Sequence, residues 1–432
     1  MQIMKTLILN NENRESVFAA LRRPYSEELL GELESKVRDI IEQVRIEGDQ
    51  GLLEITHRLE GNNLKPEELM VRQEEFERAK KQVDPELVKI IEQAIARVTS
   101  FHQAQMEKSW FYHQERGMVL GQLIQPLERV GIYVPGGKAE YPSSLIMGAV
   151  PALLAGVKEI VVVSPLGERR ELSPYLLITA QLLGISRVYK VGGAQAIAAL
   201  AYGTETITIV NKIVGPGNVY VTVAKKQVFG QVDIDMLAGP SEICIWAEEG
   251  ANSDYVVADL FSQAEHDEQA YAVLVTTSTK LAQEVARRIE QQISQFPRKE
   301  IILSSLTQNG KIIVAENESM IVEFINRFAP EHLELQIDDP WSYLGEIKNF
   351  GAVFLGPYAP EPLGDYWAGP NHILPTGGSA KHFSVLSVSD FLKRSSVIYC
   401  SREKLQEDQD NIARFADLEG LSAHAYALRI RK

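Results

Sequence analysis

A few short segments carry histidine, glutamine and carboxylate side chains that could hold a metal or move a proton. In DLFSQAEHDE, Gln263 and His266 stand three residues apart on a predicted helix, so their side chains can meet on one face. Histidine is a frequent zinc ligand and glutamine an unusual one, and no CxxC or HExxH pattern accompanies the pair. The pair alone fits either a metal site or a solvated polar helix face.

A second segment, FAPEHLEL, places Glu331 beside His332. The pair follows Pro330 and precedes an alternating apolar run, which predicts a strand with the pair at its mouth. An imidazole titrates at about 6.5, which suits proton transfer near neutrality, and an adjacent carboxylate could activate water. The local sequence equally fits a polar pair that only caps a turn.

Two more segments lie towards the C-terminus. GDYWAGPNHILPTGG is rich in glycine and proline, as functional loops are, and carries Asp365 and His372. Asp365 could give a hard oxygen to a metal. LEGLSAHAYALR places Glu419 and His424 near the chain end, where surface exposure is the default explanation.

The elements that position these residues begin with helices. Apolar residues recur at helical spacing over 37–44 and again over 52–59, on either side of Gly48 and Asp49, which predicts a helical hairpin. Asp84 as a cap, followed by Pro85, predicts the start of a further helix.

From about Val130, short β-branched runs alternate with helical stretches, as in βαβ units around a parallel sheet. Four segments read as strand ends that run into glycine or proline: GIYVPGG, EIVVVSP, RVYKVGGA and KIVGPGN. Open α/β sheets bind ligands beyond the carboxyl ends of their strands, so a ligand crevice is predicted near Tyr133, Gln195 and Asn218. GPGNVY lacks the last glycine of a GxGxxG motif, so the motif alone does not argue for a nucleotide.

A second series of predicted strands comprises AGPSEICIW, YAVLVTT, EIILS, KIIVA and GAVFLGP, which indicates another sheet domain. After Ser387 the sequence becomes more helical. This short tail cannot hold a large core, so we expect it to pack on another domain or subunit.

The composition favours a folded, multi-domain enzyme or binding protein. The chain has 432 residues, of which 45% are hydrophobic and 24% charged, and a formal net charge of −14. That charge disfavours nucleic acid and anionic membrane surfaces as partners. Cys244 and Cys400 lie in apolar runs, which fits a reducing cytoplasm, and neither a signal peptide nor a membrane span is predicted.

The order of these segments resembles that of the histidinol dehydrogenase family. The resemblance covers nearly the whole chain, through GIYVPGG, YPSS, GGAQAIAALAYGTE, GPGN, AGPSE, FSQAEHD, APEHLEL, GDYWAGPNHILPT and EGLSAHA. It implies a cytoplasmic, zinc-dependent and NAD-linked dehydrogenase that oxidises L-histidinol through L-histidinaldehyde to L-histidine. Two NAD are reduced, in the last step of histidine biosynthesis.

The resemblance also implies roles for individual residues. His332 is expected to be the general base and Glu331 to activate water. One Zn²⁺ per subunit is expected to position the substrate, on Gln263, His266, Asp365 and His424. Substrate contacts are expected from these four ligands and from Ser241, His332, His372 and Glu419, and NAD contacts from Tyr133, Gln195 and Asn218.

The implied fold is α/β, with two incomplete Rossmann-like parallel-sheet domains, a helical N-terminal region and a small C-terminal tail, in an intertwined homodimer with shared active sites. The expected divisions are an N-terminal arm (1–25), a discontinuous first α/β domain with the N-terminal helices (26–129 and 241–386), an NAD-binding domain (130–240) and a tail that completes the partner's active site (387–432).

The sequence departs from the family pattern after LPTGG, at Lys381-His382 and Ser384-Val385, outside the expected ligand set. Three alternatives remain: a relative that oxidises another alcohol such as a sulfonated diol, a zinc hydrolase without nicotinamide, and a silent binding protein. Glu419 argues against the first, because a carboxylate suits a cationic amino alcohol. The third has no support, because every matched position is filled.

Overall fold

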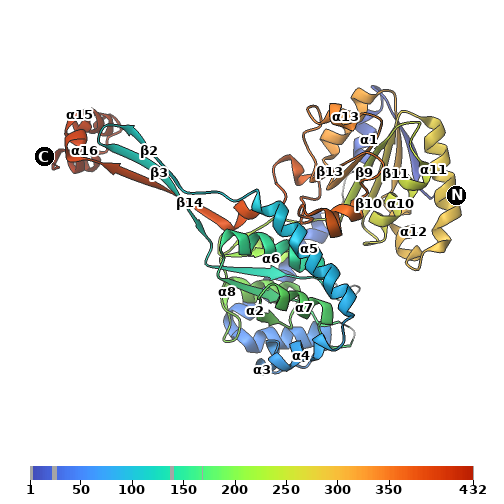
Figure 1. Ribbon diagram of the computed structural model, residues 1–432, viewed down its shortest axis with the longest axis horizontal. Coiled ribbons are helices and arrows are strands. Elements are labelled where there is room, and N and C mark those ends of the chain that lie inside the picture. The colour runs from blue at the N-terminus through green and yellow to red at the C-terminus, as the bar shows by residue number, and fades with distance from the viewer. Residues whose placement is uncertain (1–2, 22–26, 137–140, 168, 432) are drawn as a thin grey trace.

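A computed structural model describes residues 3–21, 27–136, 141–167 and 169–431. Two globular parts lie side by side, and a long, narrow arm projects from one of them (Figure 1). Parts of the predicted 1–25 arm, the final glycine of GIYVPGG and the last residue of the tail lie outside the described residues. The predicted α/β class is confirmed, since each globular part is built on a parallel sheet flanked by helices.

The larger sheet has six parallel strands in the order β1-β11-β10-β9-β12-β13. Its strands are β1 (Lys5–Leu9), β9 (Glu242–Ala247), β10 (Tyr271–Thr276), β11 (Lys311–Ala315), β12 (His332–Gln336) and β13 (Ala352–Leu355). The flanking helices are α1 (Arg14–Ala20), α10 (Ser253–Ala264), α11 (Thr279–Gln292), α12 (Lys299–Gln308) and α13 (Glu318–Phe328). Separate apolar clusters fill the two faces, so the central strands are buried throughout.

The smaller sheet has five parallel strands in the order β6-β5-β4-β7-β8. They are β4 (Arg129–Tyr133), β5 (Glu159–Val163), β6 (Arg187–Tyr189), β7 (Lys212–Val214) and β8 (Asp233–Ile234). Its helices are α2 (Glu27–Glu60), α3 (Pro66–Leu69), α4 (Gln73–Lys80), α5 (Pro85–Gln103), α6 (Pro142–Ala155), α7 (Pro174–Leu182), α8 (Gly193–Tyr202) and α9 (Val219–Val228). The four runs predicted as strand ends all finish strands of this sheet.

Both helical predictions for the N-terminal region are confirmed. α2 is interrupted at Gly48, which has φ +58°, so two helices meet at a kink there. The side chain of Asp84 accepts a hydrogen bond from the backbone N–H of Glu86 and caps α5.

Several features differ from the sequence predictions. Residues 392–400, in the tail that was expected to be helical, form a strand. EIILS is part of helix α12, because Ile302, Ser305 and Leu306 are buried at helical spacing. Strand β1, at the edge of the larger sheet, was missed. The helices of residues 27–103, expected with the 241–386 sheet, pack on the smaller sheet instead, where apolar residues of α2 share a core with α8 and α9. The remaining domain boundaries stay a prediction.

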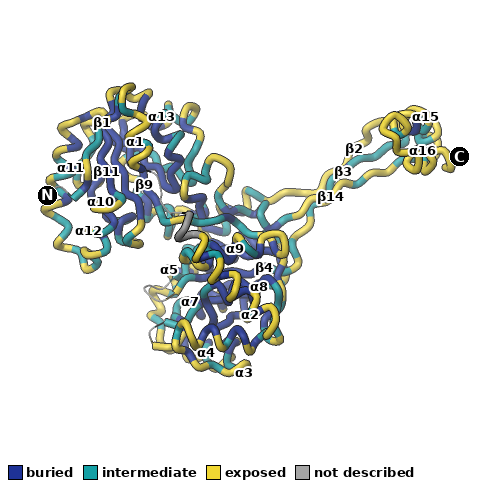
Figure 2. Tube along the Cα trace, turned by 180° about the vertical axis from the view of Figure 1, so that it is seen from behind, coloured by how far each residue is buried: buried dark blue, intermediate teal, exposed yellow. Residues whose placement is uncertain are grey.

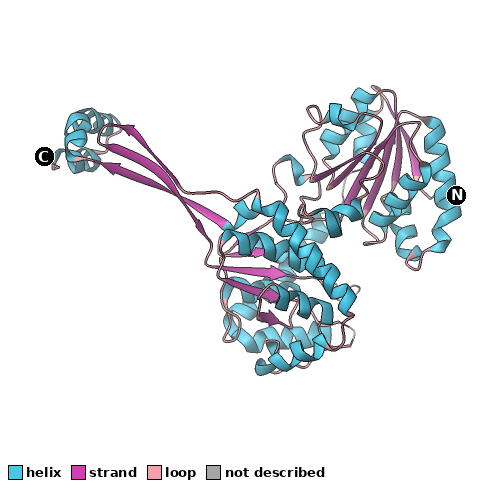
Figure 3. Cartoon of the chain, in the orientation of Figure 1, coloured by secondary structure: helices cyan, strands magenta, loops and turns pink. Residues whose placement is uncertain are grey.

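The arm is a three-stranded antiparallel sheet with two helices at its tip (Figures 1 and 3). β14 (Leu392–Cys400) pairs with β3 (Met118–Pro126), which pairs with β2 (Trp110–Glu115), and α15 (Arg402–Leu418) and α16 (Ser422–Arg429) follow. Little of the arm is buried (Figure 2). None of the helices in the described part of the chain is long and apolar enough to cross a membrane.

Candidate active site

One crevice of about 1630 Å³ is lined by both groups of predicted site residues. On one wall, Tyr133, Gln195 and Asn218 stand at or just beyond the carboxyl ends of β4, β6 and β7. The other wall carries the histidines and carboxylates, at the amino ends of β9 and β12. Glu331 and His332 were predicted to lie at the start of a strand, and they do lie at the amino end of β12. Most α/β proteins instead bind their ligands at the carboxyl ends of the strands.

His332 is the first residue of β12, and its side chain is 5% exposed. Its Nδ1 lies 3.1 Å from the carbonyl oxygen of Glu242 and 3.1 Å from Oε1 of Gln263. Both neighbours are acceptors, so Nδ1 carries the hydrogen and Nε2 keeps its lone pair. Nε2 has no hydrogen-bond partner among the described residues. Burial lowers the pKa of His332 to about 4, so the imidazole is neutral and ready to accept a proton at Nε2.

Glu331 immediately precedes β12 and is also buried. Its Oε2 accepts a hydrogen bond of 2.9 Å from the backbone N–H of Glu242, and the Ser241 side chain hydrogen-bonds to the same carboxyl. Burial raises its pKa well above the ordinary value, despite these donors. When deprotonated, the Glu331 carboxylate is therefore a stronger base than that of an exposed glutamate.

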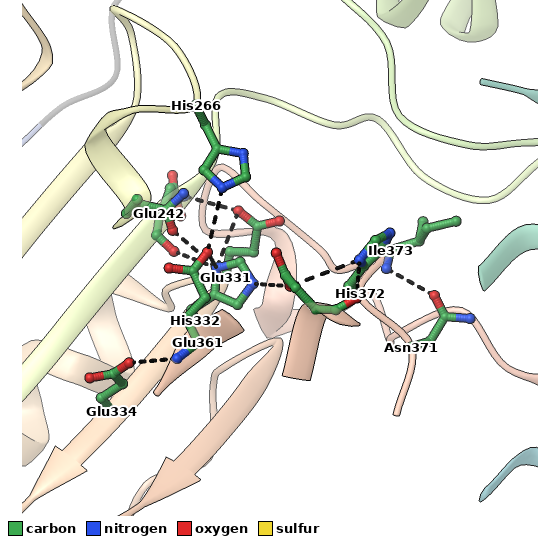
Figure 4. Close-up of polar contacts among 11 residues, drawn as sticks. Glu242, His266, Glu331, His332, Glu334, Glu361, Asn371, His372 and Ile373 are labelled. Carbon is green, nitrogen blue, oxygen red and sulfur yellow. Dashed lines mark hydrogen bonds and ion pairs between the residues drawn. The ribbon is translucent and has the colours of Figure 1, made fainter. Parts of the chain in front are cut away.

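His266 and Asp365 come together as predicted, although the connecting sequence is about a hundred residues long. The two residues and Glu361 each offer a ligand atom, and these atoms lie within 4.8 Å of one another. Gln263, in the last turn of α10, is fully buried beside them and contacts His332. His266 lies just beyond the helix end rather than on it. Figure 4 shows His266, Glu331, His332 and Glu361 turned toward a common point.

Glu361 was missed by the sequence analysis. It opens the short helix α14 (Glu361–Leu363), which runs into the π-helical turn Gly364–Ala368 that carries Asp365. Its side chain is 1% exposed, both oxygens lack a hydrogen-bond partner in the described structure, and Oε1 lies 3.8 Å from Nδ1 of His332. Its position four residues before Asp365 was the available signal, since this spacing repeats on a helical turn.

His372 and Ser241 also line the crevice. Nδ1 of His372 donates to the carbonyl oxygen of Asp365 over 3.2 Å. The loop that carries His372 is held by Asn371, whose amide donates to the carbonyl oxygen of Met147 on α6 over 2.7 Å. The loop prediction around Asp365 needs one correction, because residues 364–368 form a π-helical turn.

Glu419 and His424 lie apart from the crevice of their own chain. Both are exposed, Glu419 at the end of α15 and His424 in α16, at the tip of the arm (Figure 1). The structure therefore does not bring these two predicted site residues to the metal cluster within one chain.

The wall formed by Tyr133, Gln195 and Asn218 is held by a second set of hydrogen bonds. The hydroxyl oxygen of Tyr133 accepts from the N–H of Gly193 at 3.2 Å, and Gln195 donates to Glu60 at 3.0 Å. Asn218 caps α9 by accepting from Val221 N–H. The residues that depart from the family pattern, Lys381 and His382, are exposed and do not line this crevice.

Comparison with known proteins identifies the family. The histidinol dehydrogenase family model matches residues 23–432. This chain belongs to the histidinol dehydrogenase family. It is 50% identical over 400 residues to histidinol dehydrogenase of Listeria monocytogenes, covering 93% of each chain, and 48% identical over 426 residues to that of Carboxydothermus hydrogenoformans, covering 98% of this chain and 99% of that one.

A solved structure agrees in fold as well. The crystal structure of histidinol dehydrogenase from Elizabethkingia anophelis matches with a TM-score of 0.92 and 36% identity, over 100% of this chain and 98% of that one. Membership in the histidinol dehydrogenase family confirms the recognition from the sequence. It makes this chain an NAD-linked oxidoreductase of histidine biosynthesis.

Proposed function

We propose that this chain oxidises L-histidinol through L-histidinaldehyde to L-histidine and reduces two NAD for each substrate. The observation that carries this proposal is the shared crevice, which joins a wall suited to a dinucleotide to a buried histidine and carboxylate cluster. Two successive oxidations require that the substrate stays bound while reduced NAD leaves and a second NAD binds. The crevice can accommodate both molecules, because its two walls are distinct.

The residues present fit a zinc ion. We assign it to Gln263, His266 and Asp365, with His424 of a second copy of the chain as the fourth ligand. Nitrogen and oxygen donors of this kind suit zinc, and the clustered ligand atoms of His266 and Asp365 support the assignment. When bound, zinc would hold the amine and imidazole of the amino alcohol, and NAD would accept the hydride.

The first oxidation requires a base, and His332 fits this role. Its Nε2 accepts the hydroxyl proton of histidinol as the carbon–hydrogen bond breaks, because the carbonyl of Glu242 fixes the hydrogen on Nδ1. In the second oxidation, Glu331 takes a proton from water as that water adds to the aldehyde. The Glu242 N–H orients its carboxylate for this step. Ser241 and His372, on the same wall, are proposed to contact the substrate.

The proposal needs a second copy of the chain, because Glu419 and His424 lie at the tip of the arm. The arm exposes large apolar side chains to solvent, which is typical of a surface that binds another protein chain. They include Phe111, Ile398, Tyr399, Phe415, Leu418 and Tyr426. We propose a homodimer in which each arm completes the other chain's active site. Glu419 would then offer a carboxylate to the cationic substrate.

A stoichiometric assay tests this function. Limiting L-histidinol is added to the purified enzyme with excess NAD, and reduced nicotinamide is counted by its absorbance while zinc is measured per chain. We expect two reduced cofactors per histidinol and one zinc per chain. One reduced cofactor per substrate would contradict the double oxidation, and hydrolysis without any nicotinamide signal would favour a zinc hydrolase.

A further inference from the structure

Behind the active site lies a buried polar network that the proposed chemistry does not use. Glu334 and Gln336 follow His332 at alternate positions of β12, and both are almost fully buried. The amide of Gln336 donates to Oε2 of Glu334 at 3.0 Å and to Oδ2 of Asp259 at 2.8 Å. Burying two carboxyl groups is costly, so a network of this kind needs a reason.

The network joins three elements that surround the candidate metal ligands: α10, β12 and the segment that begins at Glu361. Asp259 lies one helical turn before Gln263 on α10, and Glu334 lies on the strand that begins with His332. Oε1 of Glu334 accepts the backbone N–H of Glu361 at 2.9 Å, which fixes the start of the segment leading to Asp365 (Figure 4).

The two acids share one hydrogen-bond donor, because the side-chain amide of Gln336 donates to both carboxyl groups. Burial raises the pKa of Glu334 well above its ordinary value, and burial also raises the pKa of Asp259. Both shifts favour the neutral forms of the acids, which reduces the cost of burying them beneath the site.

We infer that Asp259, Gln336 and Glu334 are positioning residues that set the spacing between α10, β12 and the segment of Glu361 and Asp365, and thereby the zinc affinity of the site. This inference rests on the proposed function. Residues that support metal ligands from behind matter because they restrict the ligands' orientation before the metal binds. None of the network's hydrogen bonds among the described residues reaches Tyr133, Gln195 or Asn218, so we expect NAD binding to be independent of the network.

The test compares Glu334→Ala with Glu334→Gln. Zinc affinity is measured on metal-stripped protein by competition with a chromophoric zinc chelator, and KM is measured separately for histidinol and for NAD. We expect Glu334→Ala to weaken zinc binding by roughly 10–100-fold and to raise KM for histidinol, with KM for NAD unchanged. Glu334→Gln keeps the acceptor for Glu361 N–H and mimics a protonated acid, so it should restore zinc affinity to within a few-fold of the parent.

Ile321→Ala is the control for a general loss of stability. Ile321 is fully buried in α13, on the opposite face of the sheet, so this variant should lower the melting temperature and leave zinc affinity unchanged. Should Glu334→Ala not fold, Gln336→Leu removes the bridging amide and is expected to weaken zinc binding in the same direction. Parental zinc affinity in Glu334→Ala, or in Gln336→Leu if that variant replaces it, would overturn the inference. A parent that binds no zinc would instead overturn the proposed function.

Discussion

The two ring nitrogens of His332 lie in different surroundings, and this difference decides which of them can accept a proton. The Nδ1–H faces the carbonyl oxygen of Glu242, while Nε2 has no partner within the described structure and lies 3.9 Å from Asp365 Oδ1. A neutral imidazole held in one tautomer can accept a proton only at the free nitrogen. The backbone carbonyl of Glu242, at the start of the neighbouring strand β9, thus determines which ring nitrogen can accept a proton.

We predict that His332→Asn lowers kcat by at least about 100-fold while histidinol still binds, because the amide cannot accept the hydroxyl proton. Steady-state rates and calorimetric binding of histidinol check this. His382→Asn is the matched control, since His382 is exposed and outside the crevice, and it should keep the parental rate. A parental rate in His332→Asn would refute the base assignment.

At this scale the sequence predicted part of the site. Gln263, His266, His332 and Asp365 do come together, and local spacing alone left each of them ambiguous. Their convergence depends on the order of strands in the larger sheet, where β9 and β12 are neighbours although about ninety residues separate them. Glu361 was missed because only its spacing to Asp365 pointed to it, and nothing in its own segment shows that its side chain is buried.

Helix α2 shows how one glycine shapes an element. Gly48 has φ +58° at the kink, and the next residue, Asp49, donates its backbone N–H to the carboxylate of Glu205 at 2.7 Å. This places the second half of α2 against α8 and brings Glu60 to the crevice wall of Tyr133 and Gln195, where the Glu60 carboxylate accepts a hydrogen bond from Gln195. The conformation favours glycine because a Cβ is strained at positive φ.

Gly48→Ala should therefore destabilise the protein by about 1–2 kcal/mol, both from the backbone strain and because the added Cβ would collide with the Glu205 carboxylate. Thermal or urea unfolding measures the effect. Gly31→Ala, in the same helix, is the control. Its Cβ would meet nothing within 4 Å, so it should stabilise the protein by roughly 0.5–1 kcal/mol. Equal effects of the two changes would contradict this account of the kink.

Helices and strands were predicted correctly where the local sequence fitted only one of the two structures. The four strands predicted for the smaller sheet each run into glycine or proline and were assigned correctly. EIILS was too short to distinguish a buried helix from a strand, and its helical spacing became visible only with Leu306 included. The antiparallel strands β2 and β3 were missed because they lie in the arm, where all of β2 is exposed and no apolar alternation marks a buried face.

The whole molecule combines two sheet domains that build a crevice with an arm that reaches away from it. The tip of the arm holds Glu419 and His424, so a single chain contains all the proposed site residues and still lacks a complete site. The sequence alone could not reveal this separation, because distance between segments depends on the tertiary fold. The resemblance supplied the expectation of a shared site.

Mixing two inactive variants tests the shared site. His332→Asn and His424→Ala should each be inactive as purified homodimers, but chains exchanged under mild denaturation should regain activity. Each mixed dimer has one site with both changes and one with neither, so random pairing should restore about a quarter of the parental activity. Chains of each variant taken through the same treatment alone are the control. No recovery from the mixture, with parental chains recovering fully, would mean that His424 serves its own chain.

The pairing of β14 with β3 has a consequence for how the chain is made. Paired residues such as Lys393 and Gln125 are separated by more than half of the sequence, so β3 is synthesised long before β14, the strand that completes its sheet. Until β14 has been synthesised, the β2–β3 hairpin presents a row of unpaired backbone groups together with exposed aromatic side chains such as Trp110 and Phe111. The nascent chain therefore carries an aggregation-prone edge throughout the synthesis of both sheet domains, and a stop codon before β14 would leave that edge open permanently.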